Sequence, residues 1–72
     1  MEQQELLIAL GNRIRMIRLA KDLTQSQLAG ICEFEKSTMS KIEAGRVNVS
    51  YFTLYRLSVG LDVNICQLLS AD

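Results

Sequence analysis

Residues 23–45, LTQSQLAGICEFEKSTMSKIEAG, decide the fold because they read as two short helices joined by a tight turn. Thr24 is a good N-cap for the first helix, and Gln27 stands three residues later, where the partner in a capping box belongs. Leu28 and Ile31 are spaced so that both lie on one face of that helix. We therefore expect a helix that begins after Thr24 and buries Leu28 and Ile31.

The second helix of this pair is predicted over about residues 36–44, where Met39 and Ile42 face the core and Gly45 ends the helix. The other face of this helix carries short or flexible hydrogen-bonding side chains, those of Lys36, Ser37, Ser40 and Lys41. A helix with one apolar face and one face of Lys and Ser can be held by a core and inserted into a DNA groove. The same pattern also fits two ordinary helices with a solvated surface, so periodicity alone leaves both interpretations open.

Length and composition indicate one small helical domain, residues 1–72, and exclude several classes of protein. The chain of 72 residues contains no Pro, Trp or His, and its hydrophobic content of 49% is too high for a disordered chain. No apolar run approaches the roughly 20 residues of a membrane span, and the N-terminus lacks the pattern of a signal peptide. The formal net charge of zero argues against non-specific binding of polyanions. We expect a cytoplasmic protein that does not bind membranes.

The chain offers no recognisable catalytic or metal-binding group. Cys32 and Cys66 stand alone, without CxxC spacing or His partners, so we expect two small buried or half-buried thiols rather than a disulfide or a metal site. No Cys stands beside a base, and no glycine-rich loop could cradle a phosphate. The sequence predicts neither an enzyme nor a protein that needs a cofactor or a small-molecule ligand.

Three further helices are predicted around this pair. The first covers about residues 2–21. Its apolar stripe consists of Leu7, Leu10, Ile14 and Ile17. Ser50 caps a helix over about residues 51–60, and Asn64 caps a last short helix. The apolar positions of these two helices are Leu54, Leu57, Leu61, Ile65, Leu68 and Leu69. No alternation typical of strands occurs, so the predicted fold class is all-α.

Four segments resemble, in register and without gaps, the helix-turn-helix domain of the phage-repressor superfamily of the Cro/Xre type. They are IRMIR at 14–18, LTQSQLA at 23–29, KSTMSKIEAG at 36–45 and LYRLSVGLDVNICQLL at 54–69. The resemblance implies a compact five-helix bundle of the lambda-repressor-like DNA-binding type, with the helix-turn-helix at about 24–44. It also implies a sequence-specific transcriptional regulator of double-stranded DNA, which binds a palindromic operator as a homodimer with the helix 36–44 in the major groove.

The resemblance assigns roles to individual side chains at the DNA surface. The positions that reach base edges are occupied by Lys36, Ser37 and Lys41. The positions that contact phosphates or orient the protein are occupied by Gln25, Ser40, Arg46 and Asn48. The physical properties fit, because the first turn of a recognition helix enters the groove deepest, Lys donates to guanine, and Ser serves several bases. Plain solvated helix surface is the alternative for Ser37 and Ser40.

Arg18 and Glu43 match a pair that forms an ion pair in related repressors. Such a pair would tie the end of the first helix to the end of the recognition helix, which Gln25 would also brace. The alternative is two independent surface charges. We favour the ion pair because a bidentate contact between an Arg and a carboxylate would fix the angle of the reading helix.

Three residues depart from the family pattern. Glu33 stands at the joint between the two helices, where the family has Gly, and a non-glycine residue with positive φ is strained. Glu35 replaces the usual Ser or Thr cap of the recognition helix, and it either caps that helix or accepts a hydrogen bond from a cytosine; we favour the cap. Ala44 replaces an Asn, which removes one contact with the DNA backbone.

The fourth helix carries more apolar surface than the core can use, on Tyr51, Phe52, Tyr55 and Val59. Patches of this kind usually mark an interface, and relatives often dimerise through this region, so Phe52 and Val59 are predicted to lie in a homodimer interface. A thickened core is the alternative. A second functional hypothesis is a protein-interaction module or antitoxin-type partner with weak or no DNA binding, which the neutral net charge and Glu35 favour.

Overall fold

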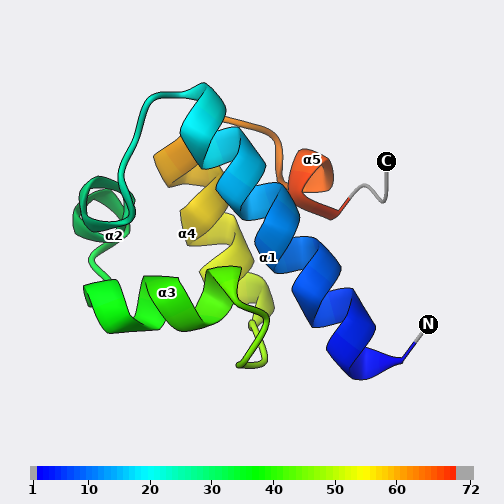
Figure 1. Ribbon diagram of the computed structural model, residues 1–72. Coiled ribbons are helices and arrows are strands. Elements are labelled where there is room, and N and C mark those ends of the chain that lie inside the picture. The colour runs from blue at the N-terminus through cyan, green and yellow to red at the C-terminus, as the bar shows by residue number, and fades with distance from the viewer. Residues whose placement is uncertain (1, 70–72) are drawn as a thin grey trace.

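The computed structural model describes residues 2–69, in which the chain forms five helices and no strand. These helices are α1 (Gln3–Ala20), α2 (Gln25–Cys32), α3 (Lys36–Glu43), α4 (Tyr51–Leu61) and α5 (Ile65–Leu69). Figure 1 shows the long α1 crossing the molecule, with the pair α2 and α3 to one side of it and α5 to the other. The predicted all-α class and the order of five helices are confirmed. None of the helices in the described range is long and apolar enough to cross a membrane.

The helix starts follow the predicted caps. The side-chain oxygen of Thr24 accepts a hydrogen bond from the backbone N–H of Gln27 at 3.0 Å, and the Gln27 side chain accepts one from the Thr24 N–H at 2.8 Å. Ser50 caps α4 by accepting a first-turn N–H at 3.1 Å, and Asn64 accepts the N–H of Cys66 at 2.9 Å. Each bond satisfies a backbone donor that has no partner inside its helix and stabilises the helix by about 1 kcal/mol.

The core draws fully buried side chains from every helix. They are Ile14, Leu28, Met39, Leu57, Leu61 and Leu68. Of the stripe predicted for α1, only Ile14 is fully buried, whereas Leu7, Leu10 and Ile17 are half-buried. Because the large apolar side chains of short helices meet at one centre, each helix is held mainly by contact with the others rather than by its own propensity.

Two expectations about burial are wrong. Ile31 is 55% exposed, because α2 buries Ala29 and Cys32, and Ile31 lies about 100° from Cys32 and about 160° from Ala29 around the helix. Cys66 is exposed rather than buried or half-buried, because it stands two positions before the buried Leu68, which again is about 160° around the helix. Ile31 therefore lies at the edge of the buried face of α2, about 60° from the fully buried Leu28, whereas Cys66 lies nearly opposite Leu68.

The helices α1 and α3 approach each other closely at Gly11. A Cβ atom at this position would lie 2.5 Å from the backbone oxygen of Glu43 and 2.6 Å from that of Ile42. A second glycine, Gly45, follows the end of α3 with a φ of +72°, and a Cβ there would lie 2.7 Å from the Cα of Ile8. The two glycines therefore let α1 lie directly against the C-terminal end of α3, which sets the direction of the exposed face of α3.

Candidate nucleic-acid interface

The helix α3 buries one side and exposes the other. Its buried side chains are those of Met39, Ile42 and Glu43. Its exposed side chains are those of Lys36, Ser37, Thr38, Ser40 and Lys41. The five positions from Lys36 to Lys41 correspond to about 140° around a helix, so the two ammonium groups flank the exposed face and the serines lie between them. The predicted base-reading residues therefore share one solvent-facing surface.

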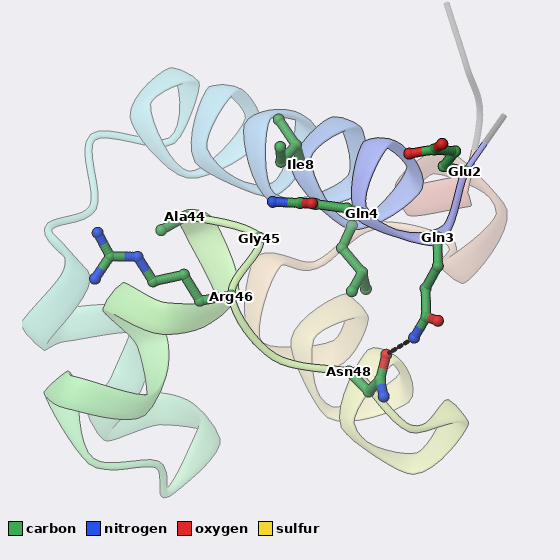
Figure 2. Close-up of a pocket in the computed structure, with 9 residues that line it drawn as sticks. Glu2, Gln3, Gln4, Ile8, Ala44, Gly45, Arg46 and Asn48 are labelled. Carbon is green, nitrogen blue, oxygen red and sulfur yellow. Dashed lines mark hydrogen bonds between the residues drawn. The ribbon is translucent and has the colours of Figure 1, made fainter.

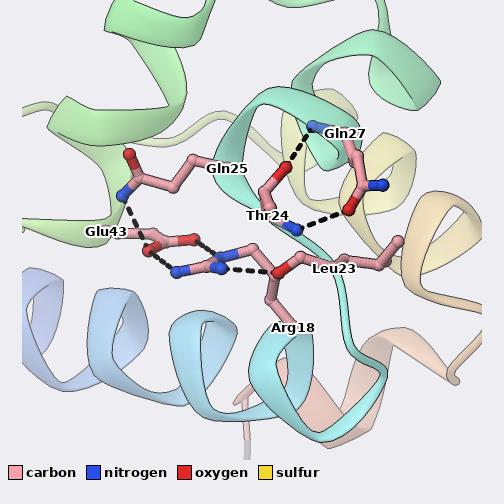
Figure 3. Close-up of polar contacts among 6 residues, drawn as sticks. All are labelled: Arg18, Leu23, Thr24, Gln25, Gln27 and Glu43. Atoms are coloured by element: carbon pink, nitrogen blue, oxygen red, sulfur yellow. Dashed lines mark hydrogen bonds and ion pairs between the residues drawn. The ribbon is translucent and has the colours of Figure 1, made fainter.

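An ion pair inside the domain fixes the end of α3 (Figure 3). Arg18 Nε donates to Glu43 Oε2 at 2.6 Å, and Arg18 Nη2 donates to Glu43 Oε1 at 3.1 Å. A third donor of the guanidinium, Nη1, bonds the backbone oxygen of Leu23 at 2.6 Å. The structure thus brings Arg18 and Glu43 together in a bidentate contact, and the alternative of two independent surface charges is wrong.

Gln25, the first residue of α2, belongs to the same network. Its Nε2 donates to Glu43 Oε1 at 3.0 Å, so a single carboxylate connects α1, α2 and α3. Gln25 and Lys36 also line the same shallow depression beside the N-terminal end of α2. A residue predicted to contact phosphate therefore lies next to a residue predicted to read bases.

Two further residues predicted to contact phosphate, Arg46 and Asn48, lie in the turn that follows α3. The Arg46 side chain is exposed, and its backbone N–H donates to the oxygen of Lys41 at 3.0 Å, so Arg46 stands directly beyond the last exposed turn of α3. Asn48 is also exposed, but its Oδ1 accepts a hydrogen bond from Gln3 Nε2 at 2.6 Å (Figure 2). Asn48 therefore ties this turn to the start of α1, a contact that no sequence pattern indicated.

The joint between α2 and α3 has the strained backbone that its sequence predicts. Glu33 adopts the left-handed conformation, with φ 60° and ψ 38°, which glycine adopts at low cost. Glu35 occupies the N-cap position of α3, but its side chain makes no capping hydrogen bond. The prediction that Glu35 is the cap of α3 is therefore confirmed for its position, although no side-chain hydrogen bond accompanies it. Its exposed carboxylate still lies at the positive end of the helix dipole.

Four large apolar side chains of α4 are exposed. Tyr51 is 71% exposed, Phe52 65%, Tyr55 53% and Val59 62%, so the alternative of a thickened core is wrong. Their positions fall within about 100° around the helix, which places them on one side of α4. This side of α4 is a continuous apolar surface of the kind that marks an interface.

Arg56 connects this apolar surface to the joint between α2 and α3. Its Nη2 lies 3.1 Å from Glu33 Oε1, and its guanidinium carbon lies 5.1 Å from the ring centre of Phe34 and 5.6 Å from that of Phe52. No prediction from the sequence included this cluster. The signal that could have indicated part of it is the spacing of Phe52 and Arg56, four positions apart on one helix face.

Comparison with known proteins agrees with this geometry. The family described as “Helix-turn-helix domain” matches residues 9–69, and the chain therefore belongs to the helix-turn-helix family. Within it, the chain is similar to control proteins: Control protein C.MunI from Mycoplasma sp is 33% identical over 67 residues, which are 92% of this chain and 90% of that protein.

Two solved structures of controller proteins are similar in both fold and sequence. The restriction-modification controller protein C.AhdI from Aeromonas hydrophila has a TM-score of 0.84 at 34% identity, over 86% of this chain and 94% of that one. The restriction-modification controller protein C.Esp1396I, solved as a tetramer in complex with its natural 35 base-pair operator, has a TM-score of 0.78 at 29% identity, over 90% of this chain and 96% of that one. The likeness thus extends over most of the chain in each comparison.

Proposed function

We propose that this protein is a sequence-specific DNA-binding transcriptional regulator of the controller-protein type, which reads a palindromic operator as a homodimer. One observation carries the proposal: α3 exposes a face of Lys and Ser, while a buried carboxylate at its end is bonded to both α1 and α2. A helix held in this way keeps its angle when it enters the major groove, which is about 12 Å wide. The similarity to C.Esp1396I, whose tetramer is complexed with its operator, supports the proposal.

The exposed side chains at both ends of α3 read the bases in this proposal. Lys36 and Ser37 stand in the first turn, which enters the groove deepest, and the Lys36 ammonium donates to O6 and N7 of guanine. Lys41 lies on the other flank of the same face, where it reaches bases further along the groove. With Lys36 and Lys41 on the two flanks of the face, we expect a half-site in which two guanines stand at separate positions.

A second group of side chains positions the domain on phosphates. Gln25 uses one amide hydrogen for Glu43, and its amide has a second hydrogen for a phosphate oxygen. The side-chain oxygen of Asn48 accepts a hydrogen bond from Gln3, which leaves the Asn48 NH2 group as a donor for a phosphate oxygen. Ser40 and Arg46 contribute a hydroxyl and a positive charge along the same side. Such contacts fix register and orientation without reading sequence.

The apolar side of α4 supplies the homodimer interface, with Phe52 and Val59 in it. Two copies related by a two-fold axis present the same surface to each other, so one apolar patch is sufficient for both. The two α3 helices then lie about one DNA turn apart, and the operator is an inverted repeat.

Selection of bound sites from random double-stranded DNA tests this function. The wild type is expected to enrich an inverted repeat with half-sites about 10–10.5 base pairs apart, or a multiple of that spacing. The variant Phe52→Glu, which places a carboxylate in the proposed interface, is expected to enrich single half-sites at most. If the wild type enriches no sequence, the proposal is wrong and the protein-interaction module becomes the better interpretation.

A further inference from the structure

The side chain of Arg56 touches two parts of the molecule that have separate tasks in the proposed function. On one side its guanidinium lies over the ring of Phe52, which is 65% exposed on the apolar side of α4. On the other side it lies over the ring of Phe34 and bonds the carboxylate of Glu33, both in the joint between α2 and α3. A single half-buried cation therefore connects the proposed dimer surface to the turn that precedes α3.

The joint depends on contacts from outside its own backbone. Glu33 is held at a φ of 60°, which is strained for a residue with a side chain. The first turn of α3 follows without a side-chain capping bond from Glu35. The N–H of Phe34 donates to the oxygen of Ala29 at 2.8 Å, that of Glu33 donates to the oxygen of Gly30 at 3.3 Å, and Phe34 packs against the core. Arg56 adds contacts with the side chains of both residues. The orientation of Lys36 therefore depends in part on how firmly Arg56 holds Glu33 and Phe34.

Solvent weakens the contacts of Arg56 in a single chain. The side chain of Glu33 is 83% exposed, and an ion pair exposed to this degree contributes little. The contact with the Phe52 ring is also open to water, and cation–π contacts are markedly stronger when they are desolvated. A partner that covers Phe52 removes water from this end of the cluster and immobilises the guanidinium.

We propose that Arg56 is a positioning residue that couples dimer formation to the placement of α3, an inference that rests on the proposed homodimer through α4. When a partner chain covers Phe52, the guanidinium is fixed between the two rings, and its bond to Glu33 holds the left-handed turn. Dimer formation then raises the affinity of each α3 for its half-site in addition to pairing two half-sites. By thermodynamic linkage, binding of a half-site strengthens the dimer by the same factor.

Amide NMR spectra recorded over a dilution series of the full chain test this coupling. In the wild type, the signals of Phe34 and Lys36 are expected to shift together with those of α4 as the concentration passes through the dimer dissociation constant. In Arg56→Met, which keeps an unbranched apolar stem but removes the charge, the α4 signals still shift and the joint signals do not. Arg56→Lys keeps the charge but not the planar group, and is expected to restore part of the shift.

Val59→Ala is the matched control, because it alters the α4 surface without removing any group of the Arg56 cluster. It is expected to move the midpoint of the dilution series to higher concentration, while the α4 and joint signals still change together. At concentrations where each variant is dimeric, the Arg56→Met protein is expected to bind operator DNA at least about 5-fold more weakly than the wild type. Met16→Ala, which shortens an exposed side chain of α1 outside the proposed interface and the DNA surface, should bind it as tightly as the wild type.

The outcomes separate the coupling from the dimer. Joint signals that stay fixed in the wild type while the α4 signals shift would overturn the coupling and leave the homodimer intact. Signals of the joint that shift as fully in Arg56→Met as in the wild type would also overturn the coupling and leave the homodimer intact. Signals that shift nowhere in a series that sedimentation shows to be monomeric throughout would remove the homodimer, and the coupling with it.

Discussion

Arg18 and Glu43 meet across the crossing of α1 and α3 through two nitrogen–oxygen contacts of 2.6 and 3.1 Å. Their side chains are only 7% and 3% exposed, so water hardly screens the interaction. A buried ion pair often adds little stability over well-packed apolar side chains, but loss of one partner leaves an uncompensated charge in the interior. The main role of the pair is therefore geometric, because the same carboxylate also accepts from Gln25 and so aligns three helices.

Removal of one partner of this pair is expected to destabilise the fold strongly. Glu43→Ala leaves Arg18 buried without its carboxylate, and the free energy of unfolding should fall by about 3–5 kcal/mol. Urea denaturation followed by circular dichroism measures the change. The matched control is Glu35→Ala, which removes an exposed carboxylate without a capping bond and should cost less than about 0.5 kcal/mol. Equal losses in the two variants would contradict the buried pair.

The same substitution at two glycines is expected to have opposite effects. Gly11→Ala places a methyl group 2.5 Å from the backbone oxygen of Glu43, so α1 and α3 must separate, and we expect a net loss of about 1–3 kcal/mol. Gly30→Ala has no atom within 4 Å of the new methyl group, and the better helix propensity of Ala should stabilise α2 by about 0.5–1 kcal/mol. Thermal unfolding of both variants provides the measurement, and a stabilised Gly11→Ala protein would refute the close crossing.

Substitutions of base-reading and of phosphate-binding residues are expected to affect DNA binding differently. Lys36→Ala should weaken binding to the operator by about 1–3 kcal/mol and relax sequence preference, because a base contact is lost. Arg46→Ala should weaken all sequences alike and reduce the slope of log K against log salt by about one unit, because a phosphate contact is lost. Fluorescence anisotropy with operator and random duplexes at several salt concentrations separates the two. Equal loss on both duplexes for Lys36→Ala would assign Lys36 to a phosphate instead.

A charge on the apolar side of α4 is expected to dissociate the homodimer. Phe52→Glu should give a monomer in sedimentation at tens of micromolar, where the wild type should sediment as a dimer, because a carboxylate would have to be buried without a partner. Met16→Glu is the control, since Met16 is 68% exposed on α1 and Phe52 is 65% exposed on α4. Dissociation by both variants, or a monomeric wild type, would count against an interface on α4.

The two thiols are expected to differ in reactivity. Burial raises the pKa of the Cys32 thiol, and the positive charge of Arg56 opposes this shift without cancelling it. The thiolate is the reacting form, so at mildly alkaline pH Cys32 should react slowly with an aromatic disulfide reagent, while the exposed Cys66 reacts quickly in the monomer. Absorbance should therefore record one fast thiol in the folded monomer and two after unfolding. Two fast thiols in the folded protein would show that Cys32 is accessible.

Local signals were sufficient to predict the elements that carry the site. Capping residues such as Thr24 and Ser50 act within one turn of the helix they begin, so a short window of sequence contains the whole interaction. The strained joint at Glu33, which has a φ of 60°, was predicted through the family resemblance, because the family has Gly at that position. The pair of Arg18 and Glu43 spans 25 positions and was likewise predictable only through the family resemblance. The roles of the exposed α3 residues toward DNA stay predictions.

The missed features all depend on how helices pack against one another. The outward direction of Ile31 follows from the side on which α2 meets the core. The bond from Gln3 to Asn48 joins residues 45 positions apart, and Arg56 reaches Glu33 over 23 positions. Periodicity indicates which face of a helix is apolar, but the crossing angles that decide these contacts are set only when the whole core assembles.

The separation of buried and exposed positions along α3 has an evolutionary consequence. The residues that hold the helix, Met39, Ile42 and Glu43, are distinct from the exposed ones, so changes at the exposed positions leave the scaffold intact. Surface substitutions of this kind usually change stability by no more than about 0.5 kcal/mol. A series of substitutions at the exposed positions can therefore change operator preference while each intermediate variant stays folded. Under the proposed base-reading role, exchange of Lys36, Ser37 and Lys41 is expected to retarget the same scaffold.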